Sequence, residues 1–320
     1  MKILIIGKVK TGGGTEMHIA EVAGALRERG LDVKTAYLED GIASLSRHIL
    51  GADIVHFFLP RPHLIGLAVC KLMLKGKTIR IMSRRSQRTC YQTSRIRLIE
   101  KFLHKRTQIL VGNSPAVCDE LRQEAPKADI RLIRNGVNIK PYDHIPSPIF
   151  RMLCVANMFP YKGHDDLFAA IEQIRPSLPK SWMLNLAGRG TERFDWPGPD
   201  PHIAGFGYCK HVNELLAGAD LFILPSHEEG SSNALLEAMM CGVPVIATDV
   251  GGNKDAVRNG ETGLLVPAHS PSKLALAIQT MADNPDMRRK MALAAQLDVA
   301  RRFSFERCVN EYEALYRSAA

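Results

Sequence analysis

The sequence contains few of the features that mark secreted or membrane-spanning proteins. It has no uninterrupted apolar stretch of transmembrane length, and its start lacks the charged segment and apolar core of a signal peptide. The seven cysteines are odd in number and scattered, and no two of them have C-x-x-C spacing. We therefore expect a cytoplasmic protein with reduced thiols, without a disulfide framework or a zinc site.

Acidic residues are scarce in one region of this chain, whose formal net charge is +9. Between Lys77 and Arg106 a single acidic residue, Glu100, accompanies ten lysines and arginines. A solvated surface, an anionic membrane or phosphorylated acceptor, and nucleic acid would each suit such a run. The run contains no nucleic-acid-binding motif and only two aromatic residues, Tyr91 and Phe102. We therefore favour an anionic acceptor or membrane surface, with a solvated surface as the alternative, and expect no nucleic acid.

The pattern of apolar residues predicts an α/β protein. Apolar segments of strand length alternate with segments of helical periodicity. Strands are expected near residues 2–7, 32–38, 53–58, 78–83, 108–113 and 130–134, and again near 152–157, 183–187, 203–206, 220–224, 244–248 and 264–266. Helices are expected at 15–29, 64–74, 94–105, 164–175 and 211–218. This alternation is typical of doubly wound parallel sheets with helices on both faces.

A proline-rich segment near the middle of the chain separates two halves. The length of 320 residues suits two domains. Residues 141–150 contain three prolines and little periodicity, so we interpret them as an interdomain linker. We predict a first domain over residues 1–145, a second over 146–304, and a C-terminal helix over 305–320. One face of that helix carries Phe305, Cys308, Val309, Tyr312, Leu315 and Tyr316.

The most informative segment is residues 224–257. Two glutamates in it, Glu229 and Glu237, lie eight residues apart. Ser231 or Ser232 is a suitable N-cap, so a helix should start there. Glu229 would then lie in the loop before the helix, and Glu237 about a turn and a half inside it. The loop follows a predicted strand, and open α/β sheets bind ligands at the carboxyl ends of their strands. Backbone amides at a helix start favour an anion such as phosphate.

This segment resembles the nucleotide-sugar signature of the retaining GT-B glycosyltransferases of family 4. That signature consists of PS-x-x-EG, a second glutamate eight residues after the first, EAM, a G-x-PV-x-AT strand and a glycine pair. The matching residues are Glu229, Gly230, Glu237, Ala238, Met239, Gly242, Pro244, Val245, Ala247, Thr248, Gly251 and Gly252. The resemblance extends, less strongly, from about residue 2 to residue 316. It implies two Rossmann-like domains facing a cleft, with a C-terminal helix that returns to the first domain.

The resemblance also implies an activity: retaining transfer of a sugar from a nucleotide diphosphate sugar, with a UDP-sugar as the expected donor. Glu229 would bind hydroxyls of the donor sugar, Glu237 the ribose, and Lys162 the diphosphate. Glu229, Lys162 and His56 are the predicted catalytic residues. We expect no cofactor and no metal ion, because no D-x-D sequence stands in a suitable place.

The loop after the first strand of the second domain departs from the family at one position. Lys162 matches a diphosphate-binding lysine, but Asn157 stands where relatives have an arginine. Asn157 can donate a neutral hydrogen bond, although it brings no charge. Further donor contacts are expected at the glycine-rich turn after residue 7, at two strand ends and at the helix start after Glu229. These residues are Gly13, Gly14, Gly188, Arg189, Phe206, Gly207, Gly230, Ser231, Ser232 and Asn233.

The acceptor is expected on the first domain. His56, Arg84 and Arg85 each lie at the end of a predicted strand, although a packing role for His56 is an equally good interpretation. We predict a glycan or a lipid-linked, lipopolysaccharide-type acceptor, and a protein that is peripheral on the inner face of a membrane. Two other functions stay open: a GT-B nucleotide-sugar epimerase, and a non-catalytic relative that binds sugar or nucleotide. Only Asn157 supports the non-catalytic relative. The N-terminal domain lacks the additional acid/base carboxylates that an epimerase would need.

Overall fold

The chain folds into two compact α/β units. The computed structural model describes residues 1–10, 14–58, 62, 64–66, 78–86, 94–138, 144–193, 200–210 and 212–319. Unit 1 consists of Met1–Gly136 together with Phe305–Ala320, and unit 2 consists of Val137–Ser304. The first segment of unit 1 ends at Gly136, before the expected boundary at residue 145, because Val137 is hydrogen-bonded to another residue of unit 2. Its amide donates to the carbonyl oxygen of Phe303 at 2.8 Å.

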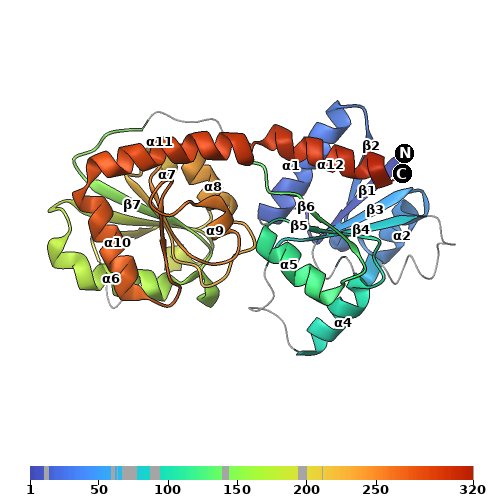
Figure 1. The fold of residues 1–320 in the computed structure, drawn as a ribbon, viewed down its shortest axis with the longest axis horizontal. Helices are drawn as coiled ribbons and strands as arrows, with labels where there is room; N and C mark the ends of the chain where they lie inside the picture. Colours follow the sequence, from blue (N-terminus) through green and yellow to red (C-terminus); the bar gives the residue numbers. More distant parts are fainter. Residues whose placement is uncertain are drawn as a thin grey trace. The chain divides into compact units, whose positions relative to one another are not determined.

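Unit 1 is built on a six-stranded sheet in the order β2-β1-β3-β4-β5-β6, in which each neighbouring pair is parallel (Figure 1). Its strands are β1 (Lys2–Gly7), β2 (Asp32–Tyr37), β3 (Ile54–Phe58), β4 (Ile79–Arg84), β5 (Ile109–Gly112) and β6 (Asp129–Leu132). The helices are α1 (Gly14–Glu28), α2 (Ile42–Leu50), α4 (Ser94–His104), α5 (Pro115–Glu124) and α12 (Phe305–Ala319). The helix expected at residues 64–74 lies mostly outside the described residues. The sheet order reverses between β1 and β3.

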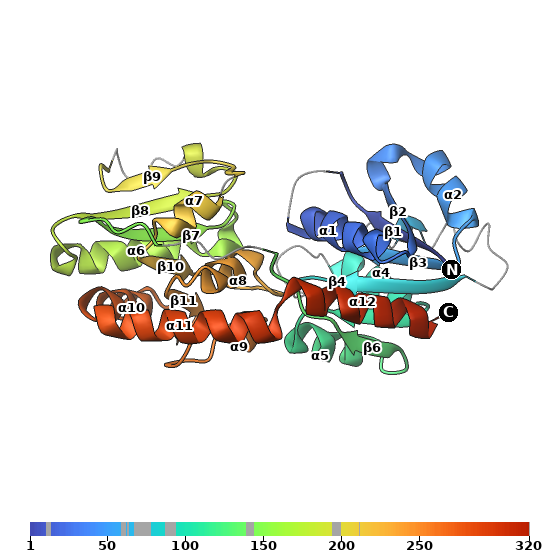
Figure 2. The same ribbon diagram turned by 90° about the horizontal axis from the view of Figure 1, so that it is seen from above.

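The C-terminal helix α12 completes the core of unit 1. Its buried side chains are Cys308, Val309, Tyr312, Leu315 and Tyr316, which are five of the six predicted apolar residues. They pack with α1 and with β1 and β3 on one face of the sheet, while α2 and α5 cover the other face (Figure 2). The periodic apolar face explains this docking, because a helix buries such a stripe against a sheet.

Unit 2 contains a second six-stranded parallel sheet, in the order β12-β11-β10-β7-β8-β9. Its strands are β7 (Phe150–Val155), β8 (Trp182–Ala187), β9 (Ile203–Gly205), β10 (Leu221–Leu224), β11 (Val245–Thr248) and β12 (Leu264–Val266). The helices are α6 (His164–Ile174), α7 (Val212–Ala217), α8 (Asn233–Met240), α9 (Asn253–Ala256), α10 (Pro271–Asp283) and α11 (Pro285–Arg302). Helices α6 and α10 pack on one face of the sheet, and α7 and α8 on the other.

The two doubly wound parallel sheets confirm the predicted fold class. In unit 2 the strand order reverses between β7 and β10, and this switch point is where open α/β sheets form a ligand-binding crevice. A ligand-binding site is therefore expected in the loops that follow these two strands. Among the described residues, no helix is both long and apolar enough to cross a membrane.

Candidate functional site

The two loops at the switch point of unit 2 bring Lys162 and Glu229 together. The Nζ of Lys162 lies 2.5 Å from Oε1 of Glu229, and both side chains are largely shielded from solvent, at 18% and 9% exposed. Lys162 ends the short 3-10 helix Pro160–Lys162, which follows β7, whereas Glu229 follows β10. The sequence predicted both residues for one site, and the structure places them in direct contact.

Close backbone packing fixes the two loops against each other. Gly163 has a φ of 70°, in the left-handed region that glycine adopts without strain. A Cβ at this position would lie 2.1 Å from the carbonyl oxygen of Pro225 in the other loop. A second link between the loops is the amide of His227, which donates to the carbonyl oxygen of Tyr161 at 2.8 Å. The position of Lys162 relative to the β10 loop is therefore set by the backbone.

Glu229 has further partners that orient its carboxylate. The hydroxyl of Ser226 donates to Oε1 of Glu229 at 2.9 Å, and Ser226 is completely buried. The hydroxyl of Thr248, at the end of β11, donates in turn to the carbonyl oxygen of Ser226. The backbone carbonyl of Glu229 accepts from the amide of Gly252 at 3.2 Å. Three neighbouring loops thus hold one carboxylate that faces the lysine.

Helix α8 starts directly after this carboxylate. Ser232 is the N-cap, since its side chain accepts a hydrogen bond from the amide of Leu235 at 3.3 Å. The cap confirms one of the two predicted serines, and Ser231 lies just before it. Asn233 is the first residue of the helix, and Glu237 is half-buried in its second turn. The first-turn amides of a helix have no intrahelical acceptor, so this end favours an anion.

Gly230 and Gly252 bring a third loop close to the start of α8. A Cβ on Gly252 would lie 2.1 Å from the carbonyl oxygen of Gly230, so only glycine fits there without displacement of the backbone. This contact explains the second glycine of the predicted glycine pair in purely steric terms.

The strand ends of β7, β8 and β9 form the other part of the edge. Asn157 accepts from the amide of Arg189 at 2.9 Å through Oδ1, which leaves its amide nitrogen as a donor. Gly188, with a φ of 141°, donates to the carbonyl oxygen of Gly207 at 2.7 Å. Phe206 is 50% exposed. The predicted donor residues of this region therefore lie together on adjacent loops of unit 2.

Arg189 extends outward from this edge. Its side chain is exposed, and its guanidinium carbon lies 5.4 Å from the ring centroid of Tyr208. Such a cation near an aromatic face keeps a positive charge and a flat ring side by side. A phosphate and a nucleobase are the two ligand groups that these side chains would suit.

In unit 1 the predicted residue His56 lies in the core. Its ring is completely buried, with Nδ1 at 2.7 Å from the hydroxyl of Tyr316 and Nε2 at 2.8 Å from the hydroxyl of Ser83. Burial, together with the nearby charge of Arg85, lowers the pKa of His56 to about 3. The ring is therefore neutral at physiological pH, and its contact with an acceptor stays a prediction.

The two predicted arginines of unit 1 differ in their surroundings. Arg84 is buried and forms ion pairs with Glu120 at 2.9 Å and Glu124 at 3.1 Å, both from α5. Arg85 is half-buried and donates to Oδ1 of Asn135 at 2.8 Å. Among the described residues, the only polar side chains that bond to Arg85 are neutral, namely Asn135 and Tyr312.

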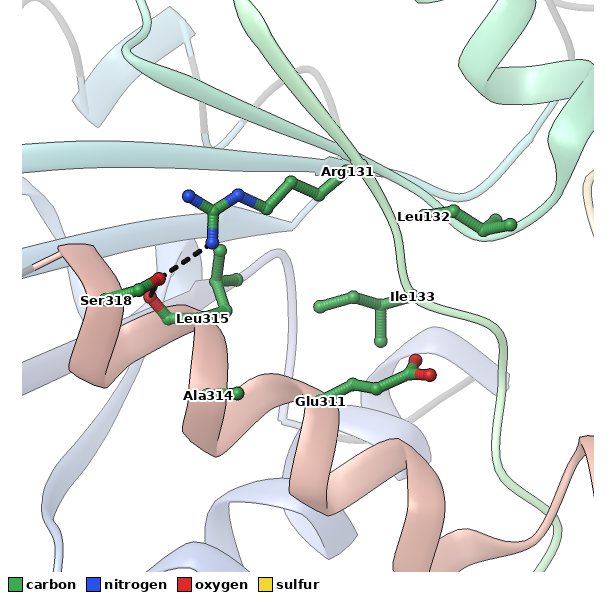
Figure 3. A pocket seen from close by; sticks show the side chains of 7 residues that line it. All are labelled: Arg131, Leu132, Ile133, Glu311, Ala314, Leu315 and Ser318. Atoms are coloured by element: carbon green, nitrogen blue, oxygen red, sulfur yellow. Dashed lines mark hydrogen bonds between the residues drawn. The ribbon is translucent and has the colours of Figure 1, made fainter.

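Unit 1 also contains one of the two predicted glycines and a pocket beside α12. Gly14 is the first residue of α1, whereas Gly13 lies outside the described residues. A pocket of about 390 Å³ lies between the end of β6 and α12, where Arg131 donates to the hydroxyl of Ser318 at 2.7 Å (Figure 3). It contains none of the predicted site residues, and we interpret it as part of the packing of α12.

Sequence reasoning missed Ser226 and Thr248 as supports of Glu229. Both belong to the family signature, Ser226 to its PS step and Thr248 to its AT step, and this was the signal that could have identified them. It also missed the histidines His227 and His269, which lie beside Asp166 in unit 2. Isolated histidines in two different loops carry no pattern that links them before the fold is known.

Comparisons with known proteins agree with this geometry. Residues 149–284 match the family model described as Glycosyl transferases group 1. The D-inositol 3-phosphate glycosyltransferase of Acidothermus cellulolyticus is 40% identical over 228 residues, which cover 66% of this chain and 50% of that protein. The glycogen synthase of Mycobacterium tuberculosis is 27% identical over 239 residues, which cover 70% of this chain and 57% of that protein. The chain thus spans about half the length of the curated relatives that it matches.

One solved structure extends the comparison to the whole chain. Anabaena Alr3699/HepE in complex with UDP-glucose matches with a TM-score of 0.84 at 18% identity, over 99% of this chain and 100% of that one. At this identity the likeness shows the fold alone, and it covers both units of this chain.

Proposed function

The chain belongs to the glycosyl transferases group 1, family 4, with the GT-B fold, and on this basis we propose that it is a retaining glycosyltransferase. Its donor would be a nucleotide diphosphate sugar. A UDP-sugar is the donor that we infer, because the similar Anabaena protein binds UDP-glucose. The observation that carries the proposal is the contact between Lys162 and Glu229 at the switch point of unit 2.

The chemistry of transfer explains why a cation and a carboxylate should meet there. Negative charge grows on the leaving diphosphate while the anomeric carbon becomes positive, so the protein must stabilise both. Lys162 and the amides at the start of α8 would bind the diphosphate. Glu229 would accept hydrogen bonds from hydroxyls of the donor sugar, and Glu237 from the ribose.

We propose that the reaction takes place on one face of the sugar. The acceptor hydroxyl forms its bond to the anomeric carbon on the side from which the diphosphate leaves. The electrons of the broken carbon–oxygen bond remain on the leaving phosphate, which takes the proton of the acceptor hydroxyl. Under this scheme Lys162 and Glu229 bind and orient the donor, and no side chain forms a covalent intermediate.

The acceptor that we propose carries an anionic group, and Arg85 supports this proposal. Among the described residues, no Asp or Glu forms an ion pair with Arg85, although Glu16 contributes attraction from further away. The stretches of unit 1 outside the described residues contain no Asp or Glu at all. A half-buried cation without a carboxylate is costly, and a phosphate or carboxylate from a ligand would offset that cost.

Helix α4 supports a membrane-bound acceptor. Leu98 and Phe102 lie one turn apart on it and are 68% and 52% exposed. The guanidinium of Arg106 lies 3.4 Å from the ring centroid of Phe102, and Lys105 adjoins it. Exposed apolar side chains among basic ones are typical of helices that bind anionic membrane surfaces. Flotation with vesicles that contain an anionic lipid tests this, and Phe102→Asp should abolish binding at low salt.

Thermal-shift titrations with UDP, GDP, ADP and their sugar conjugates test the donor site. Binding to the native state raises the melting temperature by mass action. We expect a rise with one nucleotide that Lys162→Met removes, while the control Lys180→Met, in a distant loop, leaves it intact. No rise with any nucleotide would favour the non-catalytic alternative. NMR of the nucleotide sugar without acceptor separates transfer from epimerisation, since only an epimerase alters the sugar under that condition.

A further inference from the structure

Three side chains of unit 2 that the proposed transfer does not use gather where the start of α6 meets two loops. Asp166 lies in the first turn of α6, His227 in the loop after β10, and His269 in the loop after β12. One ligand atom from each lies within 4.8 Å of the other two. Nε2 of His227 is 2.9 Å from Oδ2 of Asp166, and the two histidine ring centroids are 3.7 Å apart.

This set of donor atoms matches a particular class of ion. Two imidazoles and one carboxylate suit Zn²⁺ and related transition metals, whereas Mg²⁺ and Ca²⁺ prefer oxygen ligands. Zinc binds nitrogen and oxygen at about 2.0–2.2 Å, so its ligand atoms lie roughly 3–3.5 Å apart in a tetrahedral site. In the structure the three ligand atoms lie within 4.8 Å of one another, and His227 and Asp166 already approach to 2.9 Å. His269 is exposed, so water could reach the ion and complete its coordination.

The backbone keeps the three side chains in place. The amide of His227 is bonded to the carbonyl oxygen of Tyr161, which ties the β10 loop to the start of α6. His269 has a φ of 55° and is the only residue other than glycine with a positive φ among the described residues. A hydrogen-bonded His227–Asp166 pair accounts for two members of the cluster. It gives no reason for the exposed second imidazole, that of His269, whose ring lies 3.7 Å from the ring of His227 at an interplanar angle of 37° and whose backbone conformation is uncommon outside glycine.

We propose that Asp166, His227 and His269 form a binding site for one divalent transition-metal ion of the Zn²⁺ class. The ion links the start of α6 to the loops after β10 and β12; Lys162 lies two residues before α6, and Glu229 lies in the β10 loop. Its effect is on the stability of these loops, and the transfer step does not require it. The proposal is independent of the proposed function, because it concerns metal binding by the chain without nucleotide or acceptor.

The test is a Zn²⁺ titration of the full chain, first dialysed against a chelator, in competition with a chromogenic chelator. We expect one ion per chain and a rise in melting temperature that Mg²⁺ does not produce. His269→Asn should weaken Zn²⁺ binding by at least about tenfold, since even partners outside the coordination shell contribute that much. Asparagine tolerates the left-handed backbone, so this variant keeps the loop conformation while it removes the imidazole.

Two controls make the outcome decisive. His144→Ala removes a histidine that lies 3.2 Å from Asp220 but belongs to no cluster of three among the described residues, so binding should be unchanged. The Co²⁺ complex should lack the thiolate charge-transfer band that binding at a cysteine such as Cys209 would give. Wild-type affinity in both His269→Asn and Asp166→Asn, or a thiolate band, would overturn the proposal.

Discussion

Lys162 and Glu229 bind each other in the absence of a ligand, although they are proposed to bind different parts of the donor. Their separate substitution can therefore divide the two roles. Lys162→Met removes the charge with little change in shape, and Glu229→Gln removes the opposite charge. The double variant removes both charges, so the four proteins form a thermodynamic cycle that isolates the interaction between the two side chains.

The magnitudes follow from burial and from the remaining partners. Lys162→Met leaves the carboxylate of Glu229, 9% exposed, with the Ser226 hydroxyl as its neutral donor. Loss of the charged partner of a buried group should lower the free energy of unfolding by about 2–3 kcal/mol. Glu229→Gln should cost about 1–2 kcal/mol, since the lysine can turn toward water. The double variant should then be more stable than the sum predicts, by roughly 1–2 kcal/mol.

The assay combines urea unfolding at neutral pH with calorimetric titration of UDP and UDP-glucose. Lys162→Met should weaken UDP binding about 10–100-fold, the equivalent of roughly 1.4–2.7 kcal/mol. Glu229→Gln should leave UDP binding unchanged or tighter, because it frees the lysine, but should remove any preference for UDP-glucose over UDP. Equal weakening of UDP binding by both variants would refute the division of roles, and strict additivity of the stabilities would refute the coupling.

Three further outcomes test the packing around the two sites. In the folded protein the pKa of His56 is lowered to about 3 from 6.5. The contribution of the neutral, buried ring to the free energy of unfolding is therefore complete above pH 6.5 and is lost as the pH falls toward 3. In urea titrations between these limits, His56→Gln should reduce the pH dependence by about 1.4 kcal/mol per unit. Ser232→Ala removes the N-cap of α8 and should lower the melting temperature, at a cost of about 1 kcal/mol. Gly163→Ala should destabilise by about 2 kcal/mol or more in thermal unfolding, whereas Gly24→Ala, with open space around it in α1, should stabilise.

Local patterns were sufficient to predict both sheets and the C-terminal helix. Buried parallel strands appear in a sequence as short apolar runs, and α12 repeats its apolar residues at helical spacing. Helix α5 was not predicted, although Ser114 and Pro115 form a typical start. Its buried face includes Glu124, which lies 2.9 Å from His104 and also pairs with Arg84. A charged residue on the buried face of a helix interrupts the apolar periodicity from which a helix is predicted. Its burial is explained only by partners that lie far away in the sequence.

The same limitation affected the site residues. Glu229 and Ser232 were predicted from one short segment, residues 224–257, and Lys162 from a second local motif in the loop after the first strand of the second domain. The surroundings of His56 were not predictable, since its partner Tyr316 lies 260 residues further along the chain. A local pattern places a side chain at a strand end, but which distant helix covers that end depends on the assembled fold.

Each unit has a basic side chain at the carboxyl ends of its strands, Lys162 in unit 2 and Arg85 in unit 1, and the partners of these two side chains differ in charge. In unit 2 the charge of Lys162 is neutralised by Glu229, so under the proposed function a diphosphate would have to compete with a carboxylate that is already in contact. The same competition would free Glu229 for the donor sugar, if the diphosphate drew the lysine away. In unit 1, among the described residues, Arg85 has only neutral bonding partners. An anionic acceptor there would displace no counter-ion of the protein, so its charge should contribute fully to binding. We infer that the donor is selected by the exchange of an internal ion pair, whereas the acceptor is selected by the charge that it supplies.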